Sequence, residues 1–365
     1  MLIISRSFLL RFCWLMLFSG ALLWNTGCQK STVQPHQQPK DEIYIQETQP
    51  PIQTAVYQSI DANIGGFYLA LPARYDSTSY LYPLLIFCHG IGELGDGSAQ
   101  SLPAVLRNGP PKLIDQKKFP PDFEVNGKHF AFIVLSPQFK QWPSASDIQA
   151  IIHFAKSHYR IDSTRIYLTG LSMGGGITWD YASANTAYAA QLAAILPIAG
   201  AAWPSQQKAD TMAKAHLPVW ALHNQNDPTV PSSYSIDFVQ YLNNAHCNPP
   251  PRLTIFPVSG HDAWTKAYDP AFQENGLNVY QWDVAIPSVN LRCRLTVAIW
   301  LMYLLRFYEI FAGRKTGSYT RTAKYFQVKQ SYEINLHQLS RSAAAVAETT
   351  TLAPILAGRR RRVLH

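Results

Sequence analysis

Apolar and polar residues follow two different periodicities along the middle of the chain. Short apolar runs bounded by turn residues are typical of strands buried on both faces, whereas apolar residues three and four positions apart are typical of helices. Residues 66–74 alternate apolar and polar side chains as an edge strand does. Buried strands are expected at residues 82–88, 130–135, 165–169, 193–198, 218–223 and 252–257, and helices at residues 146–159, 174–184 and 233–244.

This order of elements predicts an α/β fold. Strands that alternate with helices are joined by right-handed crossovers, so they form a mainly parallel central sheet with helices on both faces. The pattern occupies residues 55–283, which we take as one folded domain. Active sites of such sheets form at the carboxyl ends of the strands, so residues that carry chemistry should directly follow a strand.

Residues 1–27 have the pattern of an export signal. Arg6 and Arg11 supply a positive n-region before an apolar stretch, residues 12–24, that is shorter than the roughly 20 residues of a membrane-spanning helix. Residues 25–28, Asn-Thr-Gly-Cys, resemble the lipobox of bacterial lipoproteins, although an aliphatic residue is usual in place of the asparagine. We expect an exported protein that is anchored in the cell envelope by lipid on Cys28, with ordinary secretion as the alternative.

Two segments flank the predicted domain. Residues 28–54 are rich in Gln, Pro and charge and poor in large apolar residues, which indicates a flexible linker. Residues 284–365 contain an apolar run at 295–305 and four arginines at 359–362. This basic tail has no place in the strand and helix pattern, and one hypothesis is that it is foreign to the fold.

The net charge of +8 resides in the tail. Residues 283–365 contain 13 Lys and Arg against 4 Asp and Glu, whereas the preceding 282 residues contain 18 against 19. A nucleic-acid-binding domain needs a basic face on its folded part. The near-neutral body of the chain therefore argues against a nucleic-acid partner.

The five cysteines form no Cys-x-x-Cys pair and no zinc-ligand spacing. Cys88 lies in an apolar run and is expected to be a buried core thiol. No pattern in the sequence implies a metal, nucleotide or flavin cofactor.

Residues 170–174, Gly-Leu-Ser-Met-Gly, lie between a predicted strand and a predicted helix. In that context a Gly-x-Ser-x-Gly segment makes a sharp turn that lifts the serine hydroxyl clear of the sheet, and the glycines leave room for the turn. Ser172 is therefore the candidate nucleophile, and an ordinary tight turn is the alternative.

A serine hydroxyl needs a base to take its proton and an acid to orient that base. His261 follows the last predicted strand, whereas His223 comes too early and His89 is better explained as a residue that holds its own loop. Asp227 follows the penultimate strand, and Asp262 is a poorer partner because it adjoins the histidine in sequence. The predicted triad is Ser172, Asp227 and His261.

The oxyanion that develops during acyl transfer needs N–H donors that are already in place. The amide of Met173, directly after the nucleophile, is one such donor. The loop after the strand 82–88 is rich in glycine, which lets its backbone approach a substrate carbonyl. We assign the second donor to the N–H of Ile91, with that of Gly90 as the fallback.

Four segments together resemble the α/β-hydrolase esterases: residues 89–97, 170–174, 227–231 and 260–264. The most similar branches are the phospholipase/carboxylesterase and "predicted peptidase" branches, which include polyhydroxybutyrate-depolymerase-like and feruloyl-esterase-like enzymes. The resemblance covers about residues 56–282.

The resemblance implies the α/β-hydrolase fold, and it implies the same triad and oxyanion hole, formed by Ser172, Asp227, His261 and the amides of Ile91 and Met173. The chain departs from the pattern at Leu94, where these branches often have an arginine, which puts any substrate contact made by that arginine in doubt. The family normally ends soon after the position of Trp282, which sets the tail apart.

Three tryptophans in loops after predicted strands are candidates for an aryl-ester or sugar-ester pocket, with core packing as the alternative for each: Trp142, Trp203 and Trp264. The predicted reaction is hydrolysis of a carboxylic ester, on a small molecule or a polysaccharide, through an acyl-enzyme. A serine peptidase of the same fold is the first alternative, although no propeller or large lid domain is present in the pattern. A non-catalytic, ligand-binding lipoprotein is the second.

Overall fold

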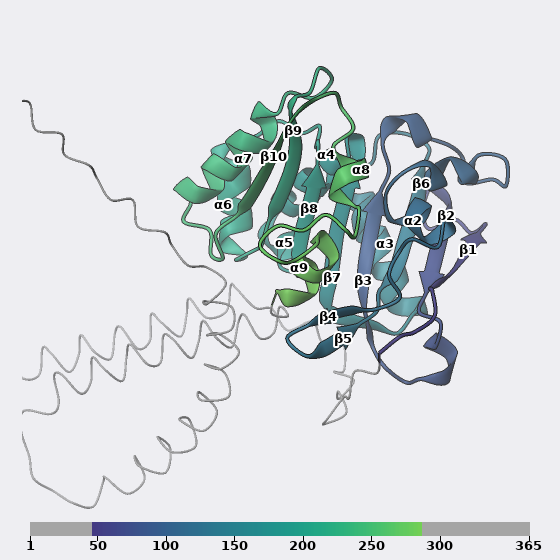
Figure 1. Ribbon diagram of the computed structural model, residues 1–365. Coiled ribbons are helices and arrows are strands. Elements are labelled where there is room, and N and C mark those ends of the chain that lie inside the picture. Colours follow the sequence, from purple (N-terminus) through teal and green to yellow (C-terminus); the bar gives the residue numbers. More distant parts are fainter. Residues whose placement is uncertain (1–45, 287–365) are drawn as a thin grey trace, which may run out of the picture.

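The computed structural model describes residues 46–286, and these contain one large mixed sheet (Figure 1). The strand order is β1-β2-β6-β3-β7-β8-β9-β10. The pairs β1–β2 and β2–β6 are antiparallel, and all later pairs are parallel. The strands are β1 (Ile52–Val56), β2 (Ile64–Leu71), β3 (Tyr82–Cys88), β6 (Ile133–Phe139), β7 (Ile161–Leu171), β8 (Ala194–Ile198), β9 (Trp220–Asn226) and β10 (Arg252–Ser259). The predicted α/β class with a mainly parallel sheet is confirmed.

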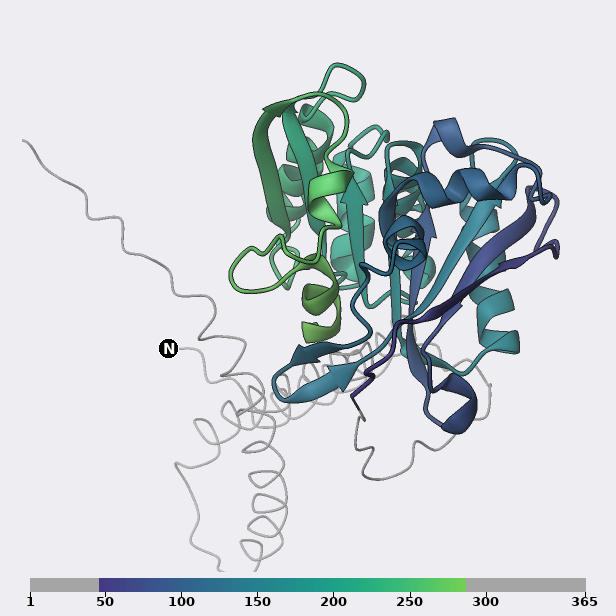
Figure 2. The same ribbon diagram turned by 45° about the vertical axis from the view of Figure 1, so that its right-hand side comes forward.

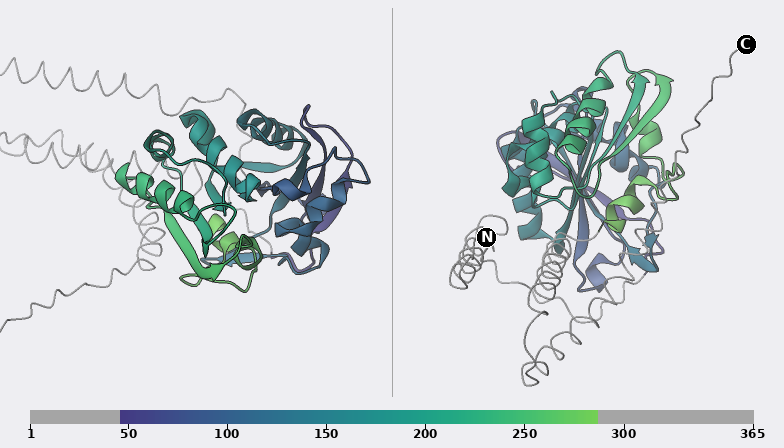
Figure 3. Two further views of the ribbon diagram at one scale, coloured as in Figure 1. Left: turned by 90° about the horizontal axis from the view of Figure 1, so that it is seen from above. Right: turned by 90° about the vertical axis from the view of Figure 1, so that its left-hand side faces the viewer.

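Helices cover both faces of the sheet (Figures 2 and 3). One apolar core lies under α3, α4, α6 and α7, and the other lies under α2, α8, α9 and a small hairpin, β4–β5. The bounds are α2 (Gly109–Asp115), α3 (Ala145–His158), α4 (Met173–Ala184), α5 (Thr186–Ala189), α6 (Gln206–Lys214), α7 (Ser233–Asn244), α8 (Trp264–Ala267), α9 (Val279–Ala285), β4 (Phe123–Val125) and β5 (Lys128–Phe130). Three 3-10 turns are η1 (Tyr75–Ser77), η2 (Ile91–Glu93) and η3 (Leu102–Arg107).

Strand β3 shows why both faces must be covered. All seven of its residues are buried. Leu84, Ile86 and Cys88 belong to one core, and Leu85 and Phe87 belong to the other, because successive side chains of a strand point to opposite faces. A strand that is apolar on both faces is stable only between two layers of helices.

Two boundaries of the domain differ from the expectation. Strand β1 begins at Ile52, inside the segment 28–54 that the sequence suggests is a linker, and its side chains are only half-buried or exposed, so its apolar signal is weak. Because β1 pairs with β2, strand β2 is internal, and the expectation of an edge strand there was wrong. At the other end α9 continues to Ala285, past the expected end at residue 283, and buries Val284.

Several short elements were not predicted from the sequence pattern. Helix α6 is largely polar, and only Ala209 and Met212 among its residues are buried, so it shows too few apolar positions to be recognised. The expected strand at residues 130–135 covers the end of β5 and the start of β6, which are separated by Ala131 and Phe132. Short or interrupted elements contain few apolar positions, so their periodicity in the sequence is weaker than that of long elements.

The predicted signal peptide 1–27, the predicted lipidation site Cys28 and the tail from residue 287 onward lie outside the described residues. Within residues 46–286, no helix combines the length and the apolar character needed to cross a bilayer.

Candidate active site

The parallel strands bring four loops to one edge of the sheet. Strands β3, β7, β8, β9 and β10 are paired in parallel, so their carboxyl ends lie on the same side. The loop after β3 contains residues 89–93, the turn after β7 contains Ser172, and the loops after β9 and β10 contain Asp227 and His261. This is the edge where sheets of this type bind their ligands.

Ser172 lies in a sharp turn between β7 and α4. Its backbone has φ 53° and ψ −114°, a left-handed conformation that is rare for a residue with a side chain. A Cβ on Gly174 would lie 1.9 Å from the Cys88 carbonyl oxygen, and a Cβ on Gly170 would lie 2.4 Å from Gly174. The motif therefore needs both glycines because the turn packs directly against its own helix and against the end of β3.

The main chain of Ser172 is held on both sides. Its N–H donates to the Ile198 carbonyl (3.0 Å), and its carbonyl accepts the N–H of Ala201 (3.0 Å). Ser172 is 9% exposed, so its hydroxyl is recessed below the surface at the carboxyl edge of the sheet. The position of the hydroxyl is thus set by the backbone of β7, β8 and α4.

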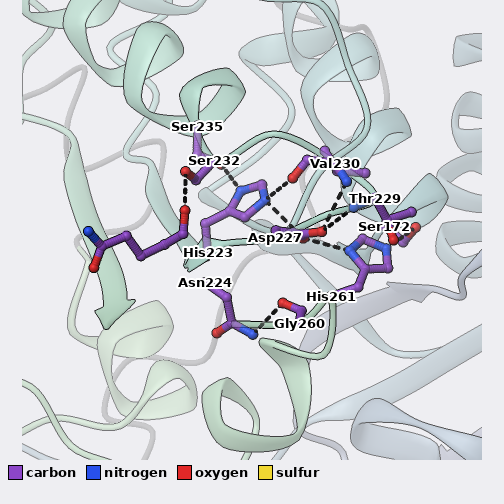
Figure 4. A network of polar contacts seen from close by, with 11 residues as sticks. Ser172, His223, Asn224, Asp227, Thr229, Val230, Ser232, Ser235, Gly260 and His261 are labelled. Atoms are coloured by element: carbon purple, nitrogen blue, oxygen red, sulfur yellow. Dashed lines mark hydrogen bonds and ion pairs between the residues drawn. The ribbon is translucent and has the colours of Figure 1, made fainter. Parts of the chain in front are cut away.

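The structure brings the three residues of the predicted triad together (Figure 4). The Nε2 atom of His261 lies 2.8 Å from Ser172 Oγ, and its Nδ1 atom lies 2.6 Å from Asp227 Oδ2. With Nδ1–H donated to the carboxylate, Nε2 is left to accept the serine proton. Asp262 takes no part in this chain, because its carboxylate accepts hydrogen bonds from the backbone and hydroxyl of Thr265.

The side chain of Asp227 is fully buried, at 0% exposure, yet its surroundings favour the ionised carboxylate. Burial by itself would raise its pKa, but hydrogen bonds from His261 and from the N–H groups of Val230 and Thr229 outweigh that effect and lower the pKa. Asp227 therefore remains a carboxylate at neutral pH and can stabilise a positive imidazole.

His223 is a fourth member of this network that the sequence interpretation set aside. Its ring is fully buried, and burial lowers its pKa, so it is neutral. The Nε2 atom faces two acceptors, the Val230 carbonyl at 3.0 Å and Asp227 Oδ2 at 3.3 Å, so the ring proton resides there. The Nδ1 atom then accepts from the hydroxyl of Ser235 at 2.8 Å (Figure 4). A histidine four residues before the predicted acid was the available signal.

The loop after β3 contains Ile91 and Gly90, the two candidates for the second oxyanion donor. The main-chain N–H of Gly90, the fallback, donates to Glu93 Oε2 at 2.6 Å and is therefore engaged. Within the described residues, the N–H groups of Ile91 and Met173 donate no hydrogen bond. A Cβ on Gly90 would lie 3.8 Å from the Cβ of Ser172, which puts this loop directly beside the serine.

His89 holds the same loop, as the sequence suggests. Its Nδ1–H donates to the Gly90 carbonyl at 2.7 Å, and its Nε2 accepts the main-chain N–H of Phe139 at 3.0 Å. The ring is fully buried, and this burial lowers the pKa of His89 to about 4, so the ring is neutral at pH 7. Its two bonds tie the loop to the neighbouring strand β6.

The three candidate tryptophans have different surroundings. Trp203 is 74% exposed and Trp142 is 47% exposed, which is unusual for side chains of this size. Trp264 is half-buried, its ring stands edge-on to that of His261 with centroids 5.0 Å apart, and its Nε1–H donates to Asn108. Trp203 comes two residues after Ala201, whose N–H binds the Ser172 carbonyl, so it lies near the site from the β8 side.

The described residues contain no group of three or more His, Cys, Asp or Glu side chains that could hold a metal ion. Cys88 is fully buried in the core at the end of β3, as expected, and burial raises the pKa of its thiol. The thiol is therefore not a nucleophile at neutral pH.

The chain is similar in part to several known proteins. A curated protein of Methylorubrum extorquens, provisionally named a carboxymethylenebutenolidase, is 30% identical over 133 residues, which make up 35% of this chain and 44% of that protein. The chain thus spans less than half the length of the curated relative that it matches. Among solved structures, a thermostable esterase is 24% identical with a TM-score of 0.41, over 60% of this chain and 57% of that one. The feruloyl esterase module from Clostridium thermocellum complexed with sinapinate is 17% identical with a TM-score of 0.41, over 64% of this chain and 91% of that one.

The family model described as phospholipase/carboxylesterase matches residues 81–271, more than half of the chain. That range begins just before β3 and ends beyond α8, so it contains the loops that carry Ser172, Asp227 and His261. The chain belongs to the phospholipase/carboxylesterase family of hydrolases and has the α/β-hydrolase fold.

Proposed function

We propose that this protein is a serine esterase that hydrolyses carboxylic esters through an acyl-enzyme. The observation that carries the proposal is the continuous chain from Ser172 Oγ to His261 Nε2 (2.8 Å) and from His261 Nδ1 to Asp227 Oδ2 (2.6 Å). A ligand-binding protein has no need of a nucleophile, a base and an acid in this arrangement.

In the first half-reaction Ser172 Oγ attacks the ester carbonyl carbon while His261 Nε2 takes the hydroxyl proton. The carbonyl oxygen becomes an oxyanion that accepts the N–H groups of Met173 and Ile91. The carbon–oxygen bond to the alcohol then breaks, and His261 returns its proton to the departing alkoxide. The alcohol leaves, and the acyl group stays on Ser172.

In the second half-reaction a water molecule gives its proton to His261 and attacks the acyl carbon. The same N–H donors hold the second oxyanion, and the bond to Ser172 Oγ breaks as His261 protonates it. Asp227 stays ionised throughout and stabilises the imidazolium that forms in each half. The products are a carboxylic acid and the free enzyme.

The substrate we propose is an ester that carries a ring, either aromatic or sugar, on a small molecule or a polysaccharide. The support comes from the tryptophans at the carboxyl edge. Trp203 leaves 74% of its surface exposed and packs against Tyr234 with ring centroids 4.8 Å apart. Exposed aromatic faces bind other rings and sugar faces well. Trp142 and Trp264 flank the same edge.

Export and lipid anchoring at Cys28 remain a proposal that rests on residues 1–28 of the sequence. Two acyl chains on one cysteine would give stable attachment to a membrane, which a single chain does not. Fatty-acid labelling of the wild type and of Cys28→Ala tests this, and equal labelling of both would rule out Cys28 as the anchor.

The first experiment treats the full chain and Ser172→Ala with a fluorophosphonate and measures the intact mass of each. One adduct on the wild type and none on the variant is the expected result. A folded wild type that gains no adduct would overturn the esterase proposal in favour of ligand binding. Matched p-nitrophenyl ester and p-nitroanilide substrates then separate an esterase from a peptidase, and faster amide cleavage would support the peptidase.

A further inference from the structure

A chain of hydrogen bonds joins the candidate oxyanion loop to the segment that follows His261. Trp264 Nε1–H donates to Asn108 Oδ1 at 3.1 Å. The amide nitrogen of Asn108 donates to Glu93 Oε1, and Gly90 N–H donates to Glu93 Oε2 at 2.6 Å. We call these four residues, Gly90, Glu93, Asn108 and Trp264, the Glu93 relay.

The direction of every bond in the Glu93 relay is fixed by chemistry. An indole N–H can only donate, so Asn108 must turn its oxygen toward Trp264 and its NH₂ group toward Glu93. A main-chain N–H can also only donate, so Gly90 needs an acceptor on Glu93. Both side-chain oxygens of Glu93 must therefore accept, and an ionised carboxylate is the side chain that does this.

The Glu93 relay contacts both the candidate oxyanion loop and the candidate base, His261. At one end it engages the N–H of Gly90, so this group cannot turn toward a substrate and the N–H of Ile91 is left for the oxyanion. At the other end Trp264 stands edge-on to the ring of His261, with centroids 5.0 Å apart and planes at 90°. The two loops approach Ser172 from different strands, β3 and β10.

We propose that Glu93 is a positioning residue that fixes the oxyanion loop relative to His261. This inference rests on the esterase function proposed above. Glu93 is 4% exposed, and its main-chain carbonyl accepts the side-chain amide of Gln138 at 3.0 Å, so the turn that carries it is itself anchored to β6. The charged or titratable groups that face it are His89, at 3.9 Å, and Arg107.

The test is the substitution Glu93→Gln in the full chain. An amide has one accepting oxygen, so either Gly90 N–H or the NH₂ of Asn108 then faces another donor. We expect kcat to fall by roughly tenfold to a hundredfold with little change in KM, because misplaced oxyanion donors act only on the transition state. The affinity for a trifluoromethyl ketone, which forms a tetrahedral adduct, should fall in parallel with kcat.

A double-mutant cycle separates a relay from a general loss of packing. In Trp264→Phe the amide of Asn108 is free to turn its oxygen toward residue 93, which accommodates glutamine there. We therefore expect Glu93→Gln to lower kcat by less than about threefold in the Trp264→Phe background, because contacting residues couple. Glu47→Gln is the matched control, since Glu47 is also buried, at 5% exposure, but lies near Tyr82 at the opposite end of β3.

If Glu93→Gln has the kcat and the ketone affinity of the wild type, the relay is overturned. The relay is also overturned if Glu93→Gln lowers kcat as much in the Trp264→Phe background as it does in the wild type. If Glu93→Gln melts below the assay temperature, Asn108→Ala replaces it: a smaller fall in kcat at constant KM is expected, and an unchanged kcat would overturn the relay. A wild type without esterase activity or phosphonate adduct would overturn the proposed function itself.

Discussion

Asp227 and Glu93 both have buried carboxylates at the carboxyl edge of the sheet, yet their pKa values are shifted in opposite directions. Burial would raise the pKa of Asp227, but hydrogen bonds from His261, Val230 and Thr229 outweigh burial and lower it. Burial raises the pKa of Glu93 more than the hydrogen bonds from Asn108 and Gly90 and the charge of Arg107 lower it. Glu93 lies in the loop after β3, and Asp227 lies in the loop after β9.

Hydrogen-bond donors decide whether a buried acid is charged. Asp227 accepts two main-chain N–H groups and the N–H of His261, and the ring N–H of His223 also faces it at 3.3 Å. Glu93 accepts one main-chain N–H and one amide. The larger set of donors keeps Asp227 ionised as the pH falls, whereas the smaller set leaves Glu93 easier to protonate.

Removing the charge of Asp227 should lower turnover more than a change at His223 or Glu93. In Asp227→Asn the shape of the side chain is kept, but His261 loses the acceptor that fixes its tautomer, so kcat should fall by about a thousandfold or more. Ester turnover normalised to folded protein measures this. Asp262→Asn is the neighbouring control with near-wild-type turnover, and a loss below about tenfold in Asp227→Asn would contradict the assigned role of Asp227.

A smaller effect is expected at His223. His223→Leu removes the ring N–H from Asp227 and leaves the Val230 carbonyl unsatisfied, so kcat should fall by about tenfold, the equivalent of one buried hydrogen-bonding partner. His223→Gln keeps an N–H donor near the same place and should recover most of the loss. Equal rates for the two variants would show that the N–H of His223 is irrelevant to catalysis.

The smallest effect concerns stability against pH. The pKa of Glu93 is raised above 4.5, so its cost to the folded state is present at neutral pH and is relieved as the pH falls toward 4.5. The pKa of Asp227 is lowered below 3.8, so its stabilisation is present above 3.8 and is lost as the pH falls through the lower folded value.

Melting temperatures across pH should therefore diverge in opposite senses. Between pH 7 and 4.5 the melting temperature of the wild type should rise relative to that of Glu93→Gln. Below pH 3.8 it should lose stability relative to Asp227→Asn. Parallel curves for the wild type and Glu93→Gln would contradict the raised pKa of Glu93.

The sequence predicted those features that depend on short segments. Strand β3 and helix α7 are long and regular enough for their periodicity to be read, and Ser172, Asp227 and His261 each directly follow a strand. Strand β1 was missed because its side chains are half-exposed, so it carries little apolar signal. In each case the clarity of the pattern follows the burial of the element.

The supporting contacts of the site could not be predicted, because they join residues that are distant in sequence. Asn108 and Trp264 are 156 positions apart, and no periodicity relates them. Trp264 was expected to line a substrate pocket, and its indole N–H is committed to Asn108 within the fold. Gly90 and Glu93 are only three positions apart, but the hydrogen bond between them depends on the 3-10 turn after β3, which the sequence pattern does not reveal.

The backbone of Ser172 has a consequence for the evolution of the protein. A side chain at φ 53° and ψ −114° costs about 1–3 kcal/mol, whereas glycine adopts such a conformation freely. Ser172→Gly should therefore be inactive and yet at least as resistant to heat as the wild type. Selection for stability alone would favour glycine at this turn. A serine there lowers the stability of the fold in return for the hydroxyl that the proposed reaction needs.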